Sequence, residues 1–79
     1  MDSTTVDARG LACPRPSHMT IEAIRLAKLG ETIIVLVDKA EARDSVIRVV
    51  KAFQLPYEVE RMRKSYEIHI SREKLWFEK

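Results

Sequence analysis

Two hydrophobic periods alternate along the chain, and they predict the order of its strands and helices. Residues 32–37 form a continuous β-branched run typical of a central strand, covered at least in part on both faces. Three further segments have the composition or the alternation of strands, namely residues 3–9, 57–62 and 65–71. The last segment alternates best, because Ile68 and Ile70 are separated by His69. We therefore expect four strands.

Apolar residues at helical spacing predict two helices between these strands. The first begins just after Cys13 and ends at Gly30. Its apolar stripe holds Met19, Ala23, Ile24 and Ala27, widened by Leu26 and Leu29. The second covers residues 41–53 and stops before Pro56. Its single apolar face holds Ala42, Val46, Val49, Val50 and Phe53.

The order β-α-β-α-β-β predicts an α+β fold, a two-layer α/β sandwich. A right-handed crossover makes the first two strands parallel, and the last two form an antiparallel hairpin around Arg63-Lys64. The simplest arrangement is a four-stranded mixed sheet with two helices on one face. We expect one domain over residues 1–79, with residues 73–79 as a C-terminal tail.

The tail holds three large apolar residues, Leu75, Trp76 and Phe77. One interpretation folds them back onto the open sheet face or the core edge. The other leaves them as an exposed apolar patch for a partner or a second copy.

Composition narrows the function classes. Hydrophobic residues make up 46% and charged residues 33%, which fits a globular protein and not a disordered one. The net charge of +2 is too small to indicate nucleic-acid binding by itself. The longest apolar run is too short to span a bilayer, and no signal-peptide pattern is present, so we expect a cytoplasmic protein with no membrane contact. A single cysteine excludes an internal disulfide framework and a multi-cysteine zinc site, and we expect no metal or other cofactor.

That cysteine, Cys13, stands where the first helix should begin, in the run Cys13-Pro14-Arg15-Pro16. Helix N-termini favour negative charge, so this position lowers a thiol pKa and suits a persulfide anion equally. Pro14 fits the first helical position, and the two prolines leave the amides of Arg15 and Ser17 as the nearby donors. The alternative is that Cys13 is a small buried apolar residue.

The segment from Asp7 to Pro16 resembles the signature of the TusA/SirA-like sulfur-carrier family. That signature has an Asp near the end of the first strand, then Gly-Leu (here Gly10-Leu11), one residue, and Cys-Pro-x-Pro opening the first helix. A second stretch of the chain also resembles the family. It consists of Gly30-Glu31, the following strand, Asp38 and Ala42-x-Asp44. The chain departs from the pattern at Ser17-His18, at Lys39 and at Leu55-Pro56, where the family usually has apolar residues, a Pro and a Gly.

The resemblance implies that Cys13 accepts sulfur as a persulfide, or carries a thiosulfonate, and that Pro14, Arg15, Pro16, Asp7 and Gly10 support it. The donor would be a cysteine desulfurase or a rhodanese-like protein, and the acceptor another protein's cysteine. Family members serve tRNA thiolation, cofactor sulfuration or sulfur metabolism. The exchange at sulfur needs no cofactor.

Several polar residues have both a structural and a functional interpretation. Asp7 could anchor the Gly10 turn or pair with Arg9 or Arg15, and Asp38 could cap the second helix or form a salt bridge near it. Asp44 is spaced to pair with Arg48. His18 is either a surface residue or a base near the sulfur. His69 should point outward to solvent.

A basic cluster, Arg61, Arg63 and Lys64, marks the predicted hairpin. It is either a solvated turn or a docking patch for an acidic partner surface. A small basic nucleic-acid-binding or regulatory domain is one alternative function, although no aromatic ladder supports direct nucleic-acid contact. A thiol-redox protein is another, and it would need an external resolving thiol.

Overall fold

A computed structural model describes residues 3–12 and 14–75 of the chain. The elements follow the expected order, and their ends lie within two residues of the predicted ones except at the end of the first helix, which stops at Leu26 and not at Gly30. In chain order they are β1 (Ser3–Asp7), α1 (Arg15–Leu26), β2 (Thr32–Val37), α2 (Ala40–Ala52), β3 (Tyr57–Arg61) and β4 (Tyr66–Ser71).

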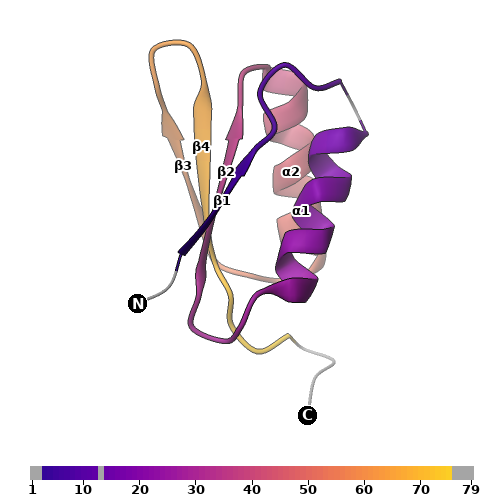
Figure 1. Cartoon of the computed structure of the whole chain (residues 1–79), viewed down its shortest axis with the longest axis vertical. Helices are drawn as coiled ribbons and strands as arrows, with labels where there is room; N and C mark the ends of the chain where they lie inside the picture. The colour runs from indigo at the N-terminus through magenta and orange to yellow at the C-terminus, as the bar shows by residue number, and fades with distance from the viewer. Residues whose placement is uncertain (1–2, 13, 76–79) are drawn as a thin grey trace.

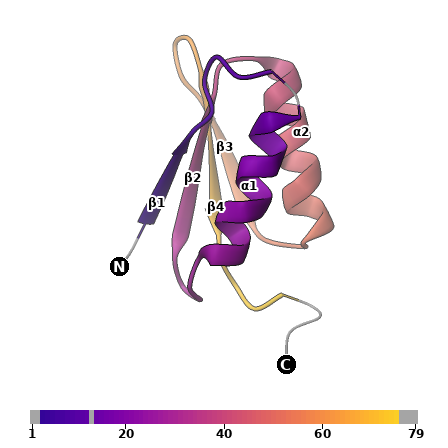
Figure 2. The ribbon, with the colours of Figure 1, turned by 45° about the vertical axis from the view of Figure 1, so that its right-hand side comes forward.

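The four strands form one mixed sheet in the order β1-β2-β4-β3. β1 and β2 are parallel, and β4 is antiparallel to both β2 and β3. Both helices cover one face of the sheet and leave the other without a helical layer (Figures 1 and 2). The predicted α+β fold class is therefore confirmed.

The core lies between the helices and the covered face of the sheet. In β2 the covered face presents Ile33, Val35 and Val37, which are fully buried. Ile34 and Leu36 point to the other face and are only half-buried. The continuous apolar run of β2 is thus fully buried on the side that the helices cover and half-buried on the other.

Helix α1 differs from the prediction in its apolar stripe. Its buried residues are Pro16, Thr20 and Ile24, which recur every four residues. Leu26 and Leu29 were expected to widen this stripe, but they are 76% and 63% exposed. Leu26 lies about 200° around the helix from Ile24, and Leu29 follows the end of the helix. Thr20 is tolerated in the core because its hydroxyl donates to the Pro16 carbonyl at 2.8 Å.

Helix α2 buries Ala42, Val46 and Val50, as its spacing predicts. Its C-terminus closes with two bonds, from the Leu55 amide to the Val50 carbonyl at 3.2 Å and from the Gln54 amide to the Lys51 carbonyl at 3.0 Å. This is a Schellman ending, which requires a left-handed residue after the helix. Gln54 takes that conformation with a φ of 58°, so the role usually filled by glycine falls to a residue with a Cβ.

Replacing Gln54 with glycine is expected to stabilise the protein. The left-handed conformation costs an L-residue roughly 1–2 kcal/mol, and glycine avoids that cost but loses more backbone entropy on folding. We expect a net gain of about 0.5–1 kcal/mol, which for a domain of this size raises the melting temperature by about 2–8 °C in calorimetry. Gln54→Ala keeps the strain and should not melt higher than the wild type. Equal gains in both variants would contradict this explanation.

The segment after β4 is fixed to the end of α1 by Arg72. This side chain is 6% exposed, and its Nε donates to the Ile24 carbonyl at 2.8 Å. Leu75 is 5% exposed and belongs to the core, so the fold-back interpretation of the tail is confirmed for this residue. Trp76 and Phe77 lie outside the described residues. No helix in the described part of the chain has the length and apolar character to cross a bilayer.

Candidate functional site

The candidate sulfur acceptor, Cys13, lies outside the described residues, but the turn before it and the helix after it are described. The turn continues from the edge of the sheet, where the Ala8 amide donates to the Leu36 carbonyl at 2.8 Å. The chain then reverses through Gly10, which has a φ of 78°, and the Leu11 amide donates back to the Ala8 carbonyl at 3.3 Å. Glycine is favoured here because a Cβ is rarely accommodated at this angle.

Asp38 holds this turn from the neighbouring strand. Its carboxylate accepts a hydrogen bond from the Gly10 amide at 3.0 Å, across 28 residues of sequence. The prediction that Asp38 caps α2 is wrong, because Lys39 occupies the N-cap position and makes no side-chain cap bond. The carboxylate instead ties the end of β2 to the loop that leads to Cys13.

Helix α1 begins one residue later than the sequence predicted. Pro14 is the N-cap, not the first helical residue, and Pro16 is the second residue of the helix. The Arg15 amide donates to the Ala12 carbonyl at 3.0 Å, and the Ser17 hydroxyl donates to the Pro14 carbonyl at 2.8 Å. Of the two amides expected to face an anion, that of Arg15 is therefore engaged in the turn, and Ser17 remains the candidate.

Pro16 also has a packing role that the sequence did not reveal. Its ring is fully buried, whereas Pro14 and the Arg15 side chain are exposed. The first turn of α1 is thus anchored in the core by one proline. The fixed φ of both prolines restricts the backbone on either side of Arg15. This gives the cysteine segment a firm attachment at its helical end.

Asp7 pairs with Arg9 and not with Arg15. The Arg9 side chain makes two bonds of 2.9 Å to the two carboxylate oxygens, and the Arg9 amide adds a third at 3.2 Å. The side-chain hydrogen bond from Arg9, helped by the amide, lowers the pKa of Asp7 from 3.8 to about 2. The same pair raises the pKa of Arg9. Both groups are solvent-exposed, so the pair shapes the turn locally.

A carboxyl-detected NMR titration should follow this pair directly. Asp7 is expected to titrate near pH 2 in the wild type, because its charged form accepts the Arg9 bonds. Since the folded pKa lies below the unfolded one, the stabilising contribution is present above pH 3.8 and is lost as the pH falls toward 2. Arg9→Gln should move the Asp7 pKa back toward 3.8, and Arg15→Gln should leave it unchanged. The reverse response would assign the pair to Arg15.

His18 lies on the exposed side of α1. It lines a shallow hollow with Ile21, Glu22 and Arg25 on the outer surface of the helix. Its backbone amide continues the helix by donating to the Pro14 carbonyl at 3.0 Å. The surface interpretation therefore accounts for the position of His18, and its role as a base toward Cys13 stays a prediction.

A groove next to the cysteine segment joins the two helices, and it was not foreseen from the sequence. It has a volume of about 390 Å³ and is lined by Pro14 and Ser17 from the start of α1. The opposite wall comes from α2, with Ser45, Arg48, Val49 and Ala52. Arg48 lines this groove, while Asp44 pairs with its neighbour Arg43 at 3.0 Å, so the predicted Asp44–Arg48 pair is wrong. Only the packing of α1 on α2 brings these side chains together.

The basic cluster Arg61, Arg63 and Lys64 is exposed, at the end of β3 and in the turn to β4. This turn lies at the same end of the sheet as the β1–α1 connection (Figures 1 and 2). It stands at the opposite edge, three strand spacings or about 14 Å across the sheet. Arg43 of α2 adds a cation here, with its guanidinium 4.8 Å from the centre of the Tyr66 ring.

Comparison with known proteins gives two consistent findings. A family model described as sulfurtransferase TusA matches residues 4–72. The crystal structure of a SirA-like protein from Desulfitobacterium hafniense superposes with a TM-score of 0.78 at 26% sequence identity. The match covers 90% of this chain and 99% of that one. The matched range includes every candidate site residue named above.

Proposed function

Because the chain belongs to the TusA sulfurtransferase family, we propose that it is a sulfur carrier that holds a persulfide on Cys13 and relays it between proteins. The observation that carries this proposal is the family match over residues 4–72, which includes the Cys13-Pro14-Arg15-Pro16 run. The described geometry supports it, because the turn before Cys13 and the helix after it are each held by specific bonds.

Sulfur moves by two thiol–disulfide-type exchanges. The Cys13 thiolate attacks the outer sulfur of a persulfide on the donor, the donor's S–S bond breaks, and the donor cysteine leaves as a thiolate. An acceptor thiolate then attacks the outer sulfur on Cys13, and Cys13 leaves as a thiolate. No external oxidant or reductant is consumed, because each step breaks one S–S bond and forms another.

The start of α1 supplies the electrostatic part of this mechanism. Cys13 directly precedes Pro14, the N-cap of a twelve-residue helix. The positive end of the helix dipole favours both the thiolate and the persulfide anion, typically by 0.3–1 kcal/mol at an exposed site. The first turn has no acidic residue to oppose this effect, and Arg15 adds an exposed cation.

Partner proteins would dock at the end of the molecule that carries the β1–α1 turn. The groove between α1 and α2 begins at Pro14, and the basic cluster of the hairpin stands at the same end. Together they suit a partner with an acidic rim and a small apolar projection. Donor and acceptor would use this surface in turn, since both must reach the same sulfur.

Intact-mass spectrometry tests the proposal. The chain is incubated with a cysteine desulfurase and cysteine, or with thiosulfate or tetrathionate, and the mass is recorded before and after reduction. We expect one added sulfur that is removed by a thiol reductant and that maps to the Cys13 peptide; a thiosulfonate adduct would identify the other cargo. Absence of any adduct on Cys13 with every donor would overturn the carrier function.

A further inference from the structure

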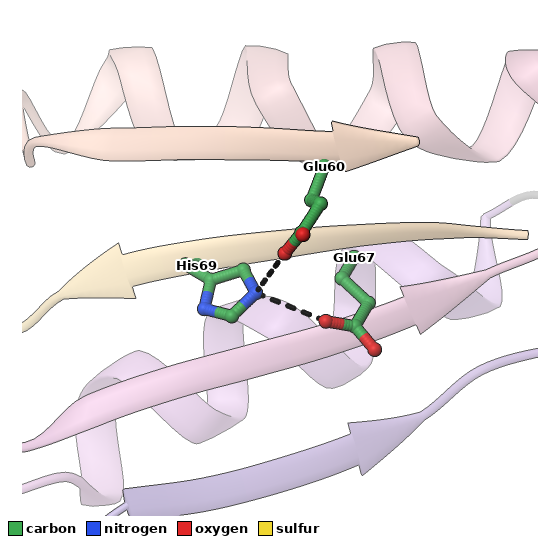
Figure 3. Close-up of side chains that lie close together, drawn as sticks. All are labelled: Glu60, Glu67 and His69. Atoms are coloured by element: carbon green, nitrogen blue, oxygen red, sulfur yellow. Dashed lines mark hydrogen bonds and ion pairs between the residues drawn. The ribbon is translucent and has the colours of Figure 1, made fainter. Parts of the chain in front are cut away.

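The open face of the sheet carries a group of side chains that the sulfur chemistry does not use. Glu60 of β3 lies directly opposite Glu67 of β4, and His69 follows two residues later on the same face. The His69 Nε2 atom is 3.1 Å from a Glu67 oxygen and 3.6 Å from a Glu60 oxygen (Figure 3). His69 points away from the helices, as its alternation predicts, but its side chain is only 34% exposed and contacts both carboxylates.

A cation between the two carboxylates would stabilise this arrangement. Two like charges directly opposite each other on adjacent strands destabilise a sheet, typically by a few tenths of a kcal/mol up to about 1 kcal/mol. Here an oxygen of each carboxylate lies near the same imidazole nitrogen, although the Glu60 side chain is 64% exposed (Figure 3). The single Nε2 atom can donate at most one proton to the two carboxylates, whereas a divalent ion would balance both charges and bind the nitrogen as well.

The three donor atoms are spaced as ligands of a small metal ion. They all lie within 4.8 Å of one another. Zinc binds imidazole nitrogen and carboxylate oxygen at about 2.0–2.2 Å, so neighbouring ligands of a tetrahedral site stand about 3.3 Å apart. The separations of 3.1 and 3.6 Å bracket that value. Because two paired strands supply the donors, the backbone register already places the three side chains next to one another on one face of the sheet.

We propose that Glu60, Glu67 and His69 form a binding site for a divalent transition-metal ion of the zinc class. Three protein ligands leave a fourth position for water or an exogenous ligand. The imidazole favours zinc, nickel or copper over magnesium and calcium, which prefer all-oxygen sites. The site does not depend on the sulfur-carrier function, since it lies on the face of the sheet away from the helices and shares no residue with the Cys13 segment (Figure 3).

NMR of the full ¹⁵N-labelled chain titrated with zinc chloride tests this site. We expect the His69 imidazole and the amides of residues 58–60 and 67–69 to shift in a saturable way, with an increase in the melting temperature. His18, the other histidine of the chain, should not respond. Shifts confined to His18 and to the flanks of Cys13 would assign the zinc to the thiol and overturn the proposal. Equal shifts with magnesium chloride would mean that the two carboxylates attract any divalent cation nonspecifically, and they would overturn the proposed site.

Two variants complete the test. Loss of a partner that merely orients a metal ligand costs 10–100-fold in affinity, so His69→Gln, which removes a ligand, should weaken zinc binding at least about tenfold. The matched control His18→Gln should bind as the wild type does. Glu67→Gln relieves the carboxylate opposition, so it should melt no lower than the wild type without zinc and gain nothing with it. Zinc affinity unchanged in His69→Gln would overturn the site.

Discussion

A Cys13→Ser variant is expected to accept no sulfur from any persulfide donor while melting within the normal range of a surface substitution. The hydroxyl cannot form the S–S bond on which the exchange depends, so the effect is complete loss and not a reduced rate. The chain has no second cysteine to take over. Intact mass after incubation with a desulfurase and cysteine measures loading, and transfer to an acceptor thiol measures relay.

The control for this variant is a measurement that shows whether it keeps the wild-type fold. Far-UV circular dichroism and the melting curve should match the wild type, because the turn and the first helical turn are held by bonds that do not involve the sulfur, from Asp38 to Gly10 and from Arg15 to Ala12. A large drop in stability would instead indicate that Cys13 is a buried structural residue. That result would remove the physical basis for assigning it to sulfur transfer.

The two other function classes predict different outcomes for the same variant. A nucleic-acid-binding domain would bind RNA or DNA in a salt-dependent way, and this binding would survive in Cys13→Ser. A thiol-redox protein would form a sulfenic acid on Cys13 under peroxide without passing sulfur to another protein. Each outcome is read from the same two samples, so the three functions separate in one set of measurements.

The fold could be predicted because its main signals are local. In β4 the buried residues Ile68 and Ile70 alternate with polar ones, and this period identifies a half-covered strand, whereas β2 is recognised by its continuous β-branched run. The order of helices and strands then leaves few topologies. The errors also have a local cause, since Leu26 and Leu29 are apolar in type but lie outside the four-residue spacing that defines the buried side of α1.

The site was harder to predict because its contacts depend on strand register and helix packing. Asp38 reaches Gly10 because β1 and β2 are parallel and end side by side, which places residues 28 apart within 3.0 Å. The facing of Glu60 and Glu67 follows from the register of the hairpin. Its turn contains no glycine or asparagine to fix a two-residue type in advance. Neither contact can be predicted from the spacing of apolar and polar residues along the chain.

Arg72 is another residue whose role only the fold reveals. The sequence places Arg72 at the end of the last predicted strand, and this position alone indicates no particular role for the side chain. In the structure this side chain is 6% exposed and donates to the carbonyl of Ile24, one of the last four carbonyls of α1. Those carbonyls lack helical partners, and a cation beside them also meets the negative end of the helix dipole.

Arg72→Ala is therefore expected to give a large loss of stability. A hydrogen bond from a charged donor contributes about 1.5–3 kcal/mol, and its removal leaves the buried Ile24 carbonyl unpaired. The favourable interaction with the helix end adds about 0.3–1 kcal/mol. We expect a total loss of about 2–4 kcal/mol, which lowers the melting temperature of a domain of this size by about 8–32 °C in calorimetry.

Lys74→Ala is the matched control, because it removes an exposed cation two residues further along the same segment. It should change the stability by less than about 0.5 kcal/mol, as surface substitutions usually do. Arg72→Lys should fall between the two, since an ammonium keeps the charge but not the planar fork that serves both the Ile24 and the Glu73 carbonyls. If Arg72→Ala and Lys74→Ala had the same melting temperature, the segment after β4 would not anchor α1.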